Sequence, residues 1–151
     1  VISSHGVCVR SDVSADDIDY DEIEGAVLPG GMPGTLNLKA SDTVHRAIKE
    51  ALLCDAYIAA ICAAPMILGE LMILDGKEAI CYPGFEDKLL GATVFQAGVI
   101  CDGNIITANA AGAAVDFAAQ LIAALKGETV DKVVSVPTVV IDAENVGDYL
   151  K

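Results

Sequence analysis

Basic side chains are scarce in this chain. Its 9 Lys and Arg residues stand against 22 Asp and Glu, which gives a formal net charge of −13 over 151 residues. A charge of this sign repels phosphate backbones and anionic membrane surfaces, and no local cluster of Lys or Arg reverses it. We therefore expect neither nucleic acid nor a membrane as a partner.

The chain also lacks any Cys-X-X-Cys pair. Its cysteines are odd in number and are spaced unlike the ligands of a zinc site or the members of a disulfide framework. They are Cys8, Cys54, Cys62, Cys81 and Cys101. Free thiols suit a reducing compartment, so we expect a cytoplasmic protein without a metal site.

No apolar stretch is long enough to predict a membrane span. The longest covers residues 57–74, and Pro65, Gly69 and Glu70 interrupt it. Repeats, low-complexity tracts and linkers are missing as well, so we expect one soluble domain over residues 1–151. Because the chain begins at Val1, without Met or a signal-peptide pattern, we expect its start to be truncated.

Strand-like and helical segments alternate along the chain. Apolar runs predict strands over residues 25–31, 57–61 and 78–82, and helical spacing predicts helices over 41–54, 63–74 and 112–126. Asp102-Gly103, between two apolar runs, predicts a β-hairpin. The alternation predicts an α/β fold with a mostly parallel sheet covered on both faces. The apolar stripe of the last helix is predicted to contain Val115, Phe117, Ala118, Leu121, Ile122 and Leu125.

Cys62 is the single residue between the strand at 57–61 and the next predicted helix. A side chain at such a joint is presented at the carboxyl edge of the sheet, where open α/β folds place their sites. Free N–H groups at the helix start favour a thiolate, and the small Ala63 and Ala64 leave room for a ligand. We predict that Cys62 is reactive, and that the other four cysteines are small buried hydrophobic residues.

Several spaced motifs resemble the ThiJ/PfpI superfamily, in the branch that contains the Parkinsonism-associated protein deglycase. They are LPGGMPGTLNL, AICAAP, CYPGFEDKL and GNIITANAAGAAVDFAAQLIAAL, in matching order between about Gly25 and Gly127. The resemblance implies a class I glutamine-amidotransferase-like fold, which is a flavodoxin-like three-layer α/β sandwich, and a homodimer. It also implies an upstream strand and helix, bearing an acidic residue that bonds the cysteine sulfur, which this chain does not contain.

The resemblance assigns roles to individual positions. Cys62 matches the nucleophilic, oxidation-prone cysteine of the family. Gly30 and Gly31 match the glycine pair whose backbone N–H groups face that sulfur, where they would hold an oxyanion. The N–H of Ala63 is a further candidate donor to the same oxyanion.

Two bases found in relatives are absent from the matching positions. Ala63 stands where the protease-like branch has a histidine, and Tyr82 stands where the deglycase branch often has one. Tyr82 remains a candidate pocket residue, but a phenol is a poor base at neutral pH. Asn109 falls where some relatives carry an arginine, and it is a candidate pocket residue that fits the end of a strand better. His45 is expected to contact solvent or a neighbouring helix rather than a substrate.

These residues support two functions. The first is a glyoxalase- or deglycase-like enzyme in which Cys62 attacks a small carbonyl substrate, a methylglyoxal-type dicarbonyl or its adducts. The second is a redox-sensing or chaperone-like protein in which Cys62 is oxidised without turnover. An amidase is disfavoured because Ala63 leaves no base to protonate the leaving amine. GGMPG lacks the P-loop lysine and the Rossmann glycine spacing, so no cofactor is expected.

Overall fold

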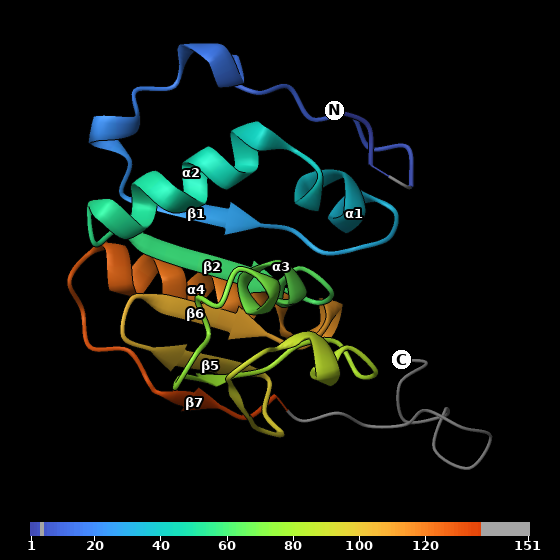
Figure 1. Ribbon diagram of the computed structural model, residues 1–151, viewed down its shortest axis with the longest axis vertical. Coiled ribbons are helices and arrows are strands. Elements are labelled where there is room, and N and C mark those ends of the chain that lie inside the picture. Colours follow the sequence, from blue (N-terminus) through green and yellow to red (C-terminus); the bar gives the residue numbers. More distant parts are fainter. Residues whose placement is uncertain (4, 137–151) are drawn as a thin grey trace, which may run out of the picture.

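The computed structural model describes residues 1–3 and 5–136, and Figure 1 shows a sheet with helices on both sides. The strands are β1 (Gly25–Leu28), β2 (Tyr57–Ile61), β3 (Glu78–Ala79), β4 (Thr93–Val94), β5 (Val99–Asp102), β6 (Ile105–Ala108) and β7 (Val133–Val134). The α-helices are α1 (Gly34–Lys39), α2 (Asp42–Leu53), α3 (Pro65–Glu70) and α4 (Ala114–Leu125). Short 3₁₀ helices are η1 (Ala15–Asp17), η2 (Tyr20–Glu22), η3 (Glu86–Lys88) and η4 (Ala111–Ala113).

Five strands form the main sheet, in the order β1-β2-β6-β5-β7. β1, β2 and β6 run parallel, while β5 is antiparallel to β6 and β7. The predicted hairpin is confirmed, but Asp102 pairs with Ile105, so its two-residue loop is Gly103-Asn104 rather than Asp102-Gly103. Gly103 adopts a φ of +65°, which the first position of such a loop needs.

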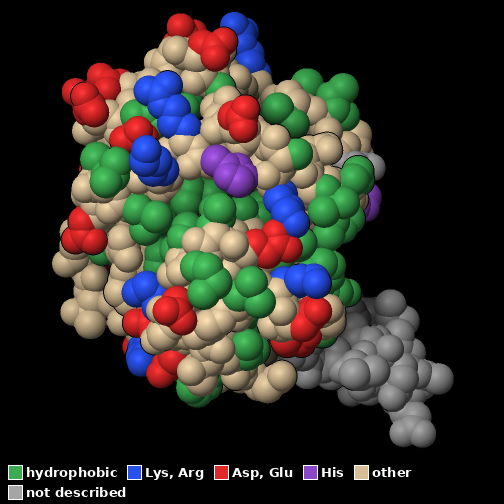
Figure 2. Space-filling view, in the orientation of Figure 1, with side chains coloured by type: hydrophobic (Ala, Val, Ile, Leu, Met, Phe, Trp, Pro, Cys, Tyr) green, Lys and Arg blue, Asp and Glu red, His purple; other side chains and the backbone are tan. Residues whose placement is uncertain are grey.

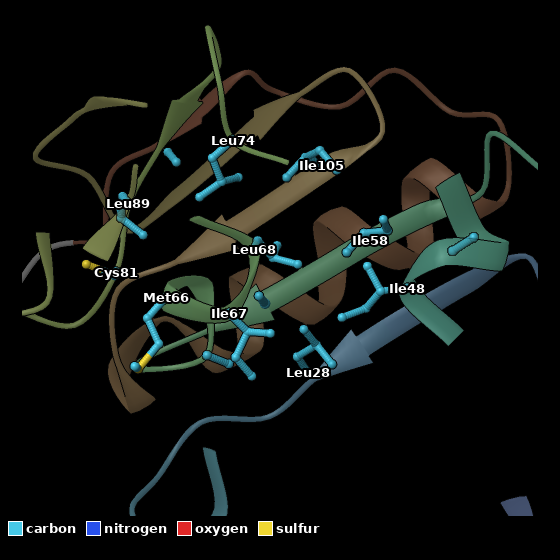
Figure 3. Close-up of a cluster of buried hydrophobic side chains, with 14 of the residues drawn as sticks. Leu28, Ile48, Ile58, Met66, Ile67, Leu68, Leu74, Cys81, Leu89 and Ile105 are labelled. Atoms are coloured by element: carbon cyan, nitrogen blue, oxygen red, sulfur yellow. The ribbon is translucent and has the colours of Figure 1, made fainter. Parts of the chain in front are cut away.

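Helices cover both faces of the sheet, which confirms the predicted three-layer sandwich. Ile58 and Ala60 of β2 belong to a core cluster with residues of α2 and α3 (Figure 3), whereas Ala59 belongs to a second cluster with residues of α4. Successive side chains of a strand point to opposite faces of the sheet. β2 is therefore buried on both sides, and its carboxyl end is held in the middle of the molecule.

α2 begins and ends where helical spacing predicts. The Ser41 hydroxyl accepts a hydrogen bond from the N–H of Val44 (3.4 Å), as a helix N-cap residue does. Ile48 and Ala51 on its inner face are fully buried. Helical spacing was therefore sufficient to locate this element.

The core face of α4 is narrower than the predicted apolar stripe. Phe117, Leu121 and Ala124 are buried, whereas Val115 is 81% exposed and Ile122 is 52% exposed. At 3.6 residues per turn the predicted stripe covers about 160° of the helix circumference, and the sheet packs against only one end of that arc. The other end leaves an apolar surface on the outside of α4.

The strand predicted at 78–82 is shorter than expected. Only Glu78–Ala79 are in a strand, and they pair with β4 in a separate two-stranded sheet. The N–H of Ile80 donates instead to Oγ1 of Thr107 (3.1 Å), and the N–H of Tyr82 donates to the carbonyl of Cys62 (2.8 Å). The segment is thereby fixed beside the turn that contains Cys62.

β1 forms one edge of the main sheet. Within the described residues only β2 pairs with it, and Val27 is 51% exposed. Toward the other end of the chain, β7 adds a strand in the segment of mixed composition that begins at Glu128. Residues 137–151 of that segment lie outside the described part. No helix in the described ranges is long and apolar enough to cross a membrane.

Candidate active site

Cys62 lies in a strained turn at the carboxyl end of β2. It adopts a φ of +66°, a left-handed conformation that is uncommon for a residue other than glycine. Its N–H donates to the carbonyl of Ala108 (2.9 Å), and its own carbonyl accepts a hydrogen bond from the N–H of Tyr82 (2.8 Å). Bonds to two neighbouring segments thus hold the turn, as strained backbone at functional sites requires.

The start of α3 contributes less to this turn than the sequence suggests. Residues 62–64 separate β2 from α3, which begins at Pro65 and is six residues long. The N–H groups of Ala64 and Met66 donate to carbonyls within the turn, and Pro65 has no N–H. Among the described residues, the N–H of Ala63 has no acceptor. The start of α3 therefore contributes one free peptide N–H, that of Ala63, rather than a helix terminus.

The glycine pair after β1 lies directly against Cys62. A Cβ atom on Gly30 would collide with Cβ of Cys62 and would lie 3.1 Å from its sulfur, so only glycine fits at this position. Gly31 adopts a φ of +90°, and its carbonyl accepts two hydrogen bonds from Thr35, at 2.8 Å from N and 3.0 Å from Oγ1. In the described part of the chain, the N–H groups of Gly30 and Gly31 donate to no acceptor.

These segments meet around a cavity of about 200 Å³. Its lining residues are Gly31, Met32, Cys62, Ala63, Tyr82 and Phe85. The structure thus brings three of the predicted site residues, Gly31, Ala63 and Tyr82, together with Cys62. Gly30 lies against the cysteine but does not line the cavity. The site combines a thiol with unbonded backbone N–H groups. A thiol in such a site can add to a carbonyl carbon, and the N–H groups can donate hydrogen bonds to the resulting oxyanion.

Asn109 does not line this cavity. Its N–H and its side-chain Nδ2 donate to the carbonyls of Gly98 and Ala97, at 3.0 and 2.9 Å, so it ties the end of β6 to the segment before β5. It lines a neighbouring polar cavity of about 300 Å³ together with Gln96 and Ser135. The strand-end role considered for Asn109 is the one that the structure shows.

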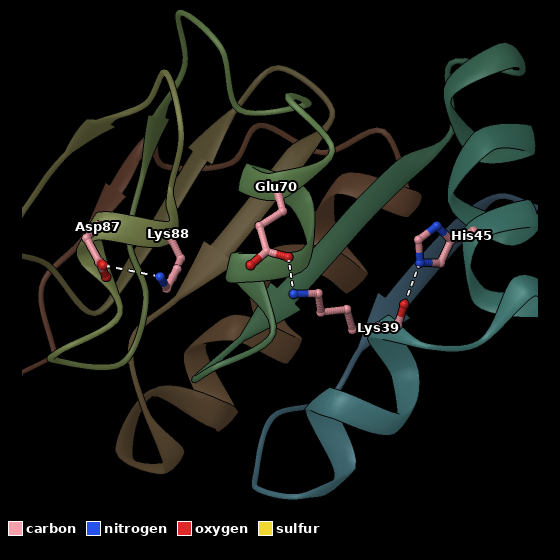
Figure 4. Close-up of polar contacts among 5 residues, drawn as sticks. All are labelled: Lys39, His45, Glu70, Asp87 and Lys88. Atoms are coloured by element: carbon pink, nitrogen blue, oxygen red, sulfur yellow. Dashed lines mark hydrogen bonds and ion pairs between the residues drawn. The ribbon is translucent and has the colours of Figure 1, made fainter.

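His45 also lies outside the cavity and serves the packing of helices. Its Nε2 donates to the carbonyl of Lys39 (2.6 Å), and the Lys39 ammonium pairs with Glu70, so these contacts link α1, α2 and α3 (Figure 4). Beside His45, apolar side chains gather in a hollow between α2 and the segment after α3 (Figure 2). Of the described residues, those that line this hollow include no cysteine and no carboxylate.

The other cysteines divide into two groups. Cys81 and Cys101 are buried, and burial raises the pKa of their thiols to about 12 and about 11, with further increases from the carboxylates of Glu86 and Asp131. The prediction that these two are buried is confirmed. Cys8 and Cys54 are exposed, so describing them as buried hydrophobic residues was wrong. Neither lines the Cys62 cavity.

Two lining residues, Met32 and Phe85, were missed in the sequence. Met32 follows the glycine pair directly, and Phe85 lies three residues after Tyr82, so proximity to identified motifs was the available signal. Within the described ranges, no three His, Cys, Asp or Glu side chains group together as metal ligands would.

Comparison with known proteins places this chain in a family. The model of the DJ-1/PfpI family matches residues 1–124. Protein DJ-1 homolog B of Arabidopsis thaliana is 33% identical over 98% of this chain, which spans only 34% of that protein's length. A protein of Pyrococcus abyssi named as a deglycase is 29% identical over 83% of this chain and 76% of its own length.

The fold agrees with a solved structure as well. The oxidised DJ-1 of Toxoplasma gondii superposes with a TM-score of 0.74 at 31% identity, over 81% of this chain and 67% of that one. The family that the motifs resembled is thereby confirmed, together with its fold. The chain belongs to the DJ-1/PfpI family.

Proposed function

We propose that this protein is a cysteine-dependent enzyme of the glyoxalase or deglycase type, acting on methylglyoxal-like dicarbonyls or on their early adducts with protein thiols and amines. The observation that carries the proposal is the placement of the Cys62 thiol in a small cavity shared with Gly31 and Ala63, whose N–H groups are unbonded within the described residues. The Pyrococcus relative named as a deglycase supports the same chemistry.

The reaction begins with addition to the aldehyde. The Cys62 thiolate forms a bond to the aldehyde carbon, and the carbonyl electron pair moves to oxygen. Backbone donors at Gly31 and Ala63 stabilise that oxyanion until it is protonated to a hemithioacetal; one such donor is worth roughly 10²–10³ in rate in other enzymes. Transfer of hydrogen from C1 to C2 of methylglyoxal, followed by addition of water, releases lactate and restores the thiol without an external oxidant.

Substitution of Cys62 tests this proposal directly. We expect Cys62→Ser to lower kcat/KM for methylglyoxal by at least about 100-fold, because a serine hydroxyl is a much weaker nucleophile without an adjacent base. Cys54→Ser is the matched control, since Cys54 is exposed and lies outside the cavity. Lactate formation is measured for both. Retention of activity in Cys62→Ser would refute the mechanism.

A second candidate function is redox sensing through oxidation of Cys62. It is favoured by the lining of the cavity, which within the described residues includes no His, Asp or Glu to act as a base, and by the oxidised state of the Toxoplasma relative. Peptide mass spectrometry after mild peroxide treatment tests it. A sensor predicts that Cys62 gains oxygen before the more exposed Cys8 and Cys54 do, and equal oxidation of all three would contradict it.

We also propose that the working unit is a homodimer. Support comes from the outer face of α4, where Val115, Ile122 and Leu125 expose apolar side chains that a second copy would cover. Sedimentation velocity tests the assembly state. A single species near the chain mass of 15.6 kDa at all concentrations would exclude the dimer.

A further inference from the structure

The cavity in front of Cys62 has a strongly apolar wall. Apart from Gly31 and Cys62, the lining side chains are those of Met32, Ala63, Tyr82 and Phe85. No charged side chain of the described residues lines it, and the Tyr82 hydroxyl is its only side-chain oxygen. Polar side chains gather instead in the neighbouring cavity at Gln96 and Asn109, which shares no lining residue with this one.

The two aromatic residues form an ordered pair. The ring centroids of Tyr82 and Phe85 are 6.4 Å apart with an interplanar angle of 73°, an edge-to-face arrangement. Phe85 packs against the main core cluster, and its N–H donates to the carbonyl of Tyr82 (3.1 Å). Because the N–H of Tyr82 donates to the carbonyl of Cys62, the aromatic wall is held at a fixed position relative to the sulfur.

We infer that the site selects α-oxoaldehydes that carry an aromatic or bulky apolar substituent over those that carry a methyl group or a polyhydroxylated chain. The inference rests on the proposed carbonyl chemistry of Cys62. An aryl substituent beside Tyr82 and Phe85 buries apolar area and extends the edge-to-face contact. Sugar-type hydroxyls would instead lose their hydrogen bonds to water without gaining hydrogen bonds to the protein. Drug-sized ligands fill roughly 300–1,000 Å³. A cavity of about 200 Å³ is suited to a single ring beside the dicarbonyl.

Alkylation of Cys62 measures this selectivity without requiring turnover. Phenacyl bromide and bromoacetone differ only in phenyl against methyl, and each reacts when the thiolate forms the S–C bond and bromide leaves. Rates at Cys62 and at the exposed Cys54 are followed by peptide mass spectrometry on the full chain, each normalised to glutathione. We expect the phenyl-to-methyl rate ratio to be at least tenfold higher at Cys62 than at Cys54. Equal ratios at the two cysteines would overturn the inference.

Substitutions of Tyr82 and Phe85 test whether these two residues produce the selectivity. Tyr82 is 46% exposed, so Tyr82→Ser should fold and should lower the ratio at Cys62 about threefold or more, whereas Tyr82→Phe should retain it. Phe85→Leu keeps an apolar contact with the core and should also lower the ratio. Phe95→Leu is the control, because Phe95 is partly exposed and lies outside the cavity. An unchanged ratio in both Tyr82→Ser and Phe85→Leu would refute the aromatic wall as its source.

Steady-state turnover then distinguishes the proposed enzyme activity from the proposed selectivity of the cavity. A kcat/KM at least tenfold higher for phenylglyoxal than for methylglyoxal, abolished in Cys62→Ser, supports both. Turnover of methylglyoxal with no gain for phenylglyoxal supports the enzyme and refutes the selectivity. Absence of turnover with the phenyl preference intact in alkylation refutes the enzyme and supports the selectivity of the cavity.

Discussion

Gly30 and Cys62 pack so closely that position 30 has no space for a side chain. A Cβ atom on Gly30 would lie 2.7 Å from the carbonyl oxygen of Ile61, in addition to colliding with Cβ of Cys62. Cys62 has little freedom to move away, because both of its backbone polar groups are hydrogen-bonded and its φ is already positive. The position of the thiol therefore depends on a neighbour with no side chain.

Gly30→Ala should lower the stability of the protein and slow the alkylation of Cys62. We expect the free energy of unfolding to fall by about 1–3 kcal/mol, the usual cost of overpacking, and Cys62 alkylation to slow several-fold as the sulfur is displaced. Gly34→Ala is the matched control, since nothing lies within 4 Å of a Cβ atom there and its φ is not positive. Urea denaturation and iodoacetamide kinetics measure the two effects. Equal behaviour of the two variants would show that the close contact is unimportant.

The buried thiols of Cys81 and Cys101 make stability depend on alkaline pH. Their pKa values are raised from 9.0 to about 12 and about 11, chiefly by burial. In the unfolded chain both thiols ionise near pH 9, so above that pH the unfolded state binds fewer protons than the folded state. The contribution of the two buried thiols to the free energy of unfolding is therefore complete below pH 9. It is lost as the pH rises toward their pKa values in the folded state.

The free energy of unfolding is thus predicted to fall at alkaline pH. Each thiol should contribute a fall of up to about 1.4 kcal/mol per pH unit between about pH 9 and pH 11. Cys81→Ala should remove one contribution and Cys101→Ala the other. Urea denaturation at several pH values gives the slopes. A Cys81→Ala slope equal to that of the unmodified chain would contradict the assignment.

At the scale of elements, the segment after β3 is positioned by a side chain of another strand. Thr107 of β6 is buried, and its Oγ1 accepts the hydrogen bond from the buried N–H of Ile80 (3.1 Å). This bond replaces the strand pairing that the apolar run at 78–82 suggested. It also sets the path of the chain into Tyr82 and Phe85, which wall the cavity of Cys62.

Thr107→Val should therefore loosen this segment. The substitution keeps the shape of the side chain but leaves the Ile80 N–H unsatisfied, which costs about 1–3 kcal/mol in a buried setting. Thr43→Val, at an exposed position of α2, should change stability by no more than about 0.5 kcal/mol. Thermal denaturation compares the variants, and hydrogen exchange at Ile80 reports the local effect. Unchanged protection of the Ile80 N–H in Thr107→Val would be evidence against this role.

At the scale of the whole molecule, negative charge dominates. Among the described residues, the ion pairs are Lys39–Glu70, Lys88–Asp87 and Lys132–Glu78, whose side chains are all at least partly exposed. Exposed pairs contribute only about 0–1 kcal/mol each. They offset little of the self-repulsion that a net charge of −13 imposes on a compact chain.

Salt should therefore stabilise this protein. Raising NaCl from about 10 mM to about 150 mM shortens the Debye length from about 30 Å to about 8 Å and screens the repulsion. We expect Tm to rise by at least about 2 °C. Replacing the exposed Asp16 and Asp17 of η1 by Asn should reduce this rise. A Tm that falls with salt in scanning calorimetry would mean that attractive pairs dominate instead.

Local patterns in the sequence were sufficient for some of the elements and for naming Cys62 as the candidate cysteine. A capping serine, helical spacing and the Pro and Gly stops act within a few residues, so α2, β2 and the β5–β6 hairpin follow from the sequence. The joint position likewise set Cys62 apart from the other four cysteines, because neighbouring residues impose the backbone geometry of that joint. The glycine pair was linked to Cys62 by the family resemblance rather than by a local pattern.

Only the tertiary structure decided what surrounds that cysteine. Met32, Tyr82 and Phe85 come from segments distant in sequence, and their convergence on Cys62 depends on strand order and on long-range bonds such as that from Ile80 to Thr107. Which N–H groups stay unbonded also depends on where acceptors from other segments lie. Periodicity likewise cannot tell which side of α4 meets the sheet, because both sides are apolar and only packing buries one of them.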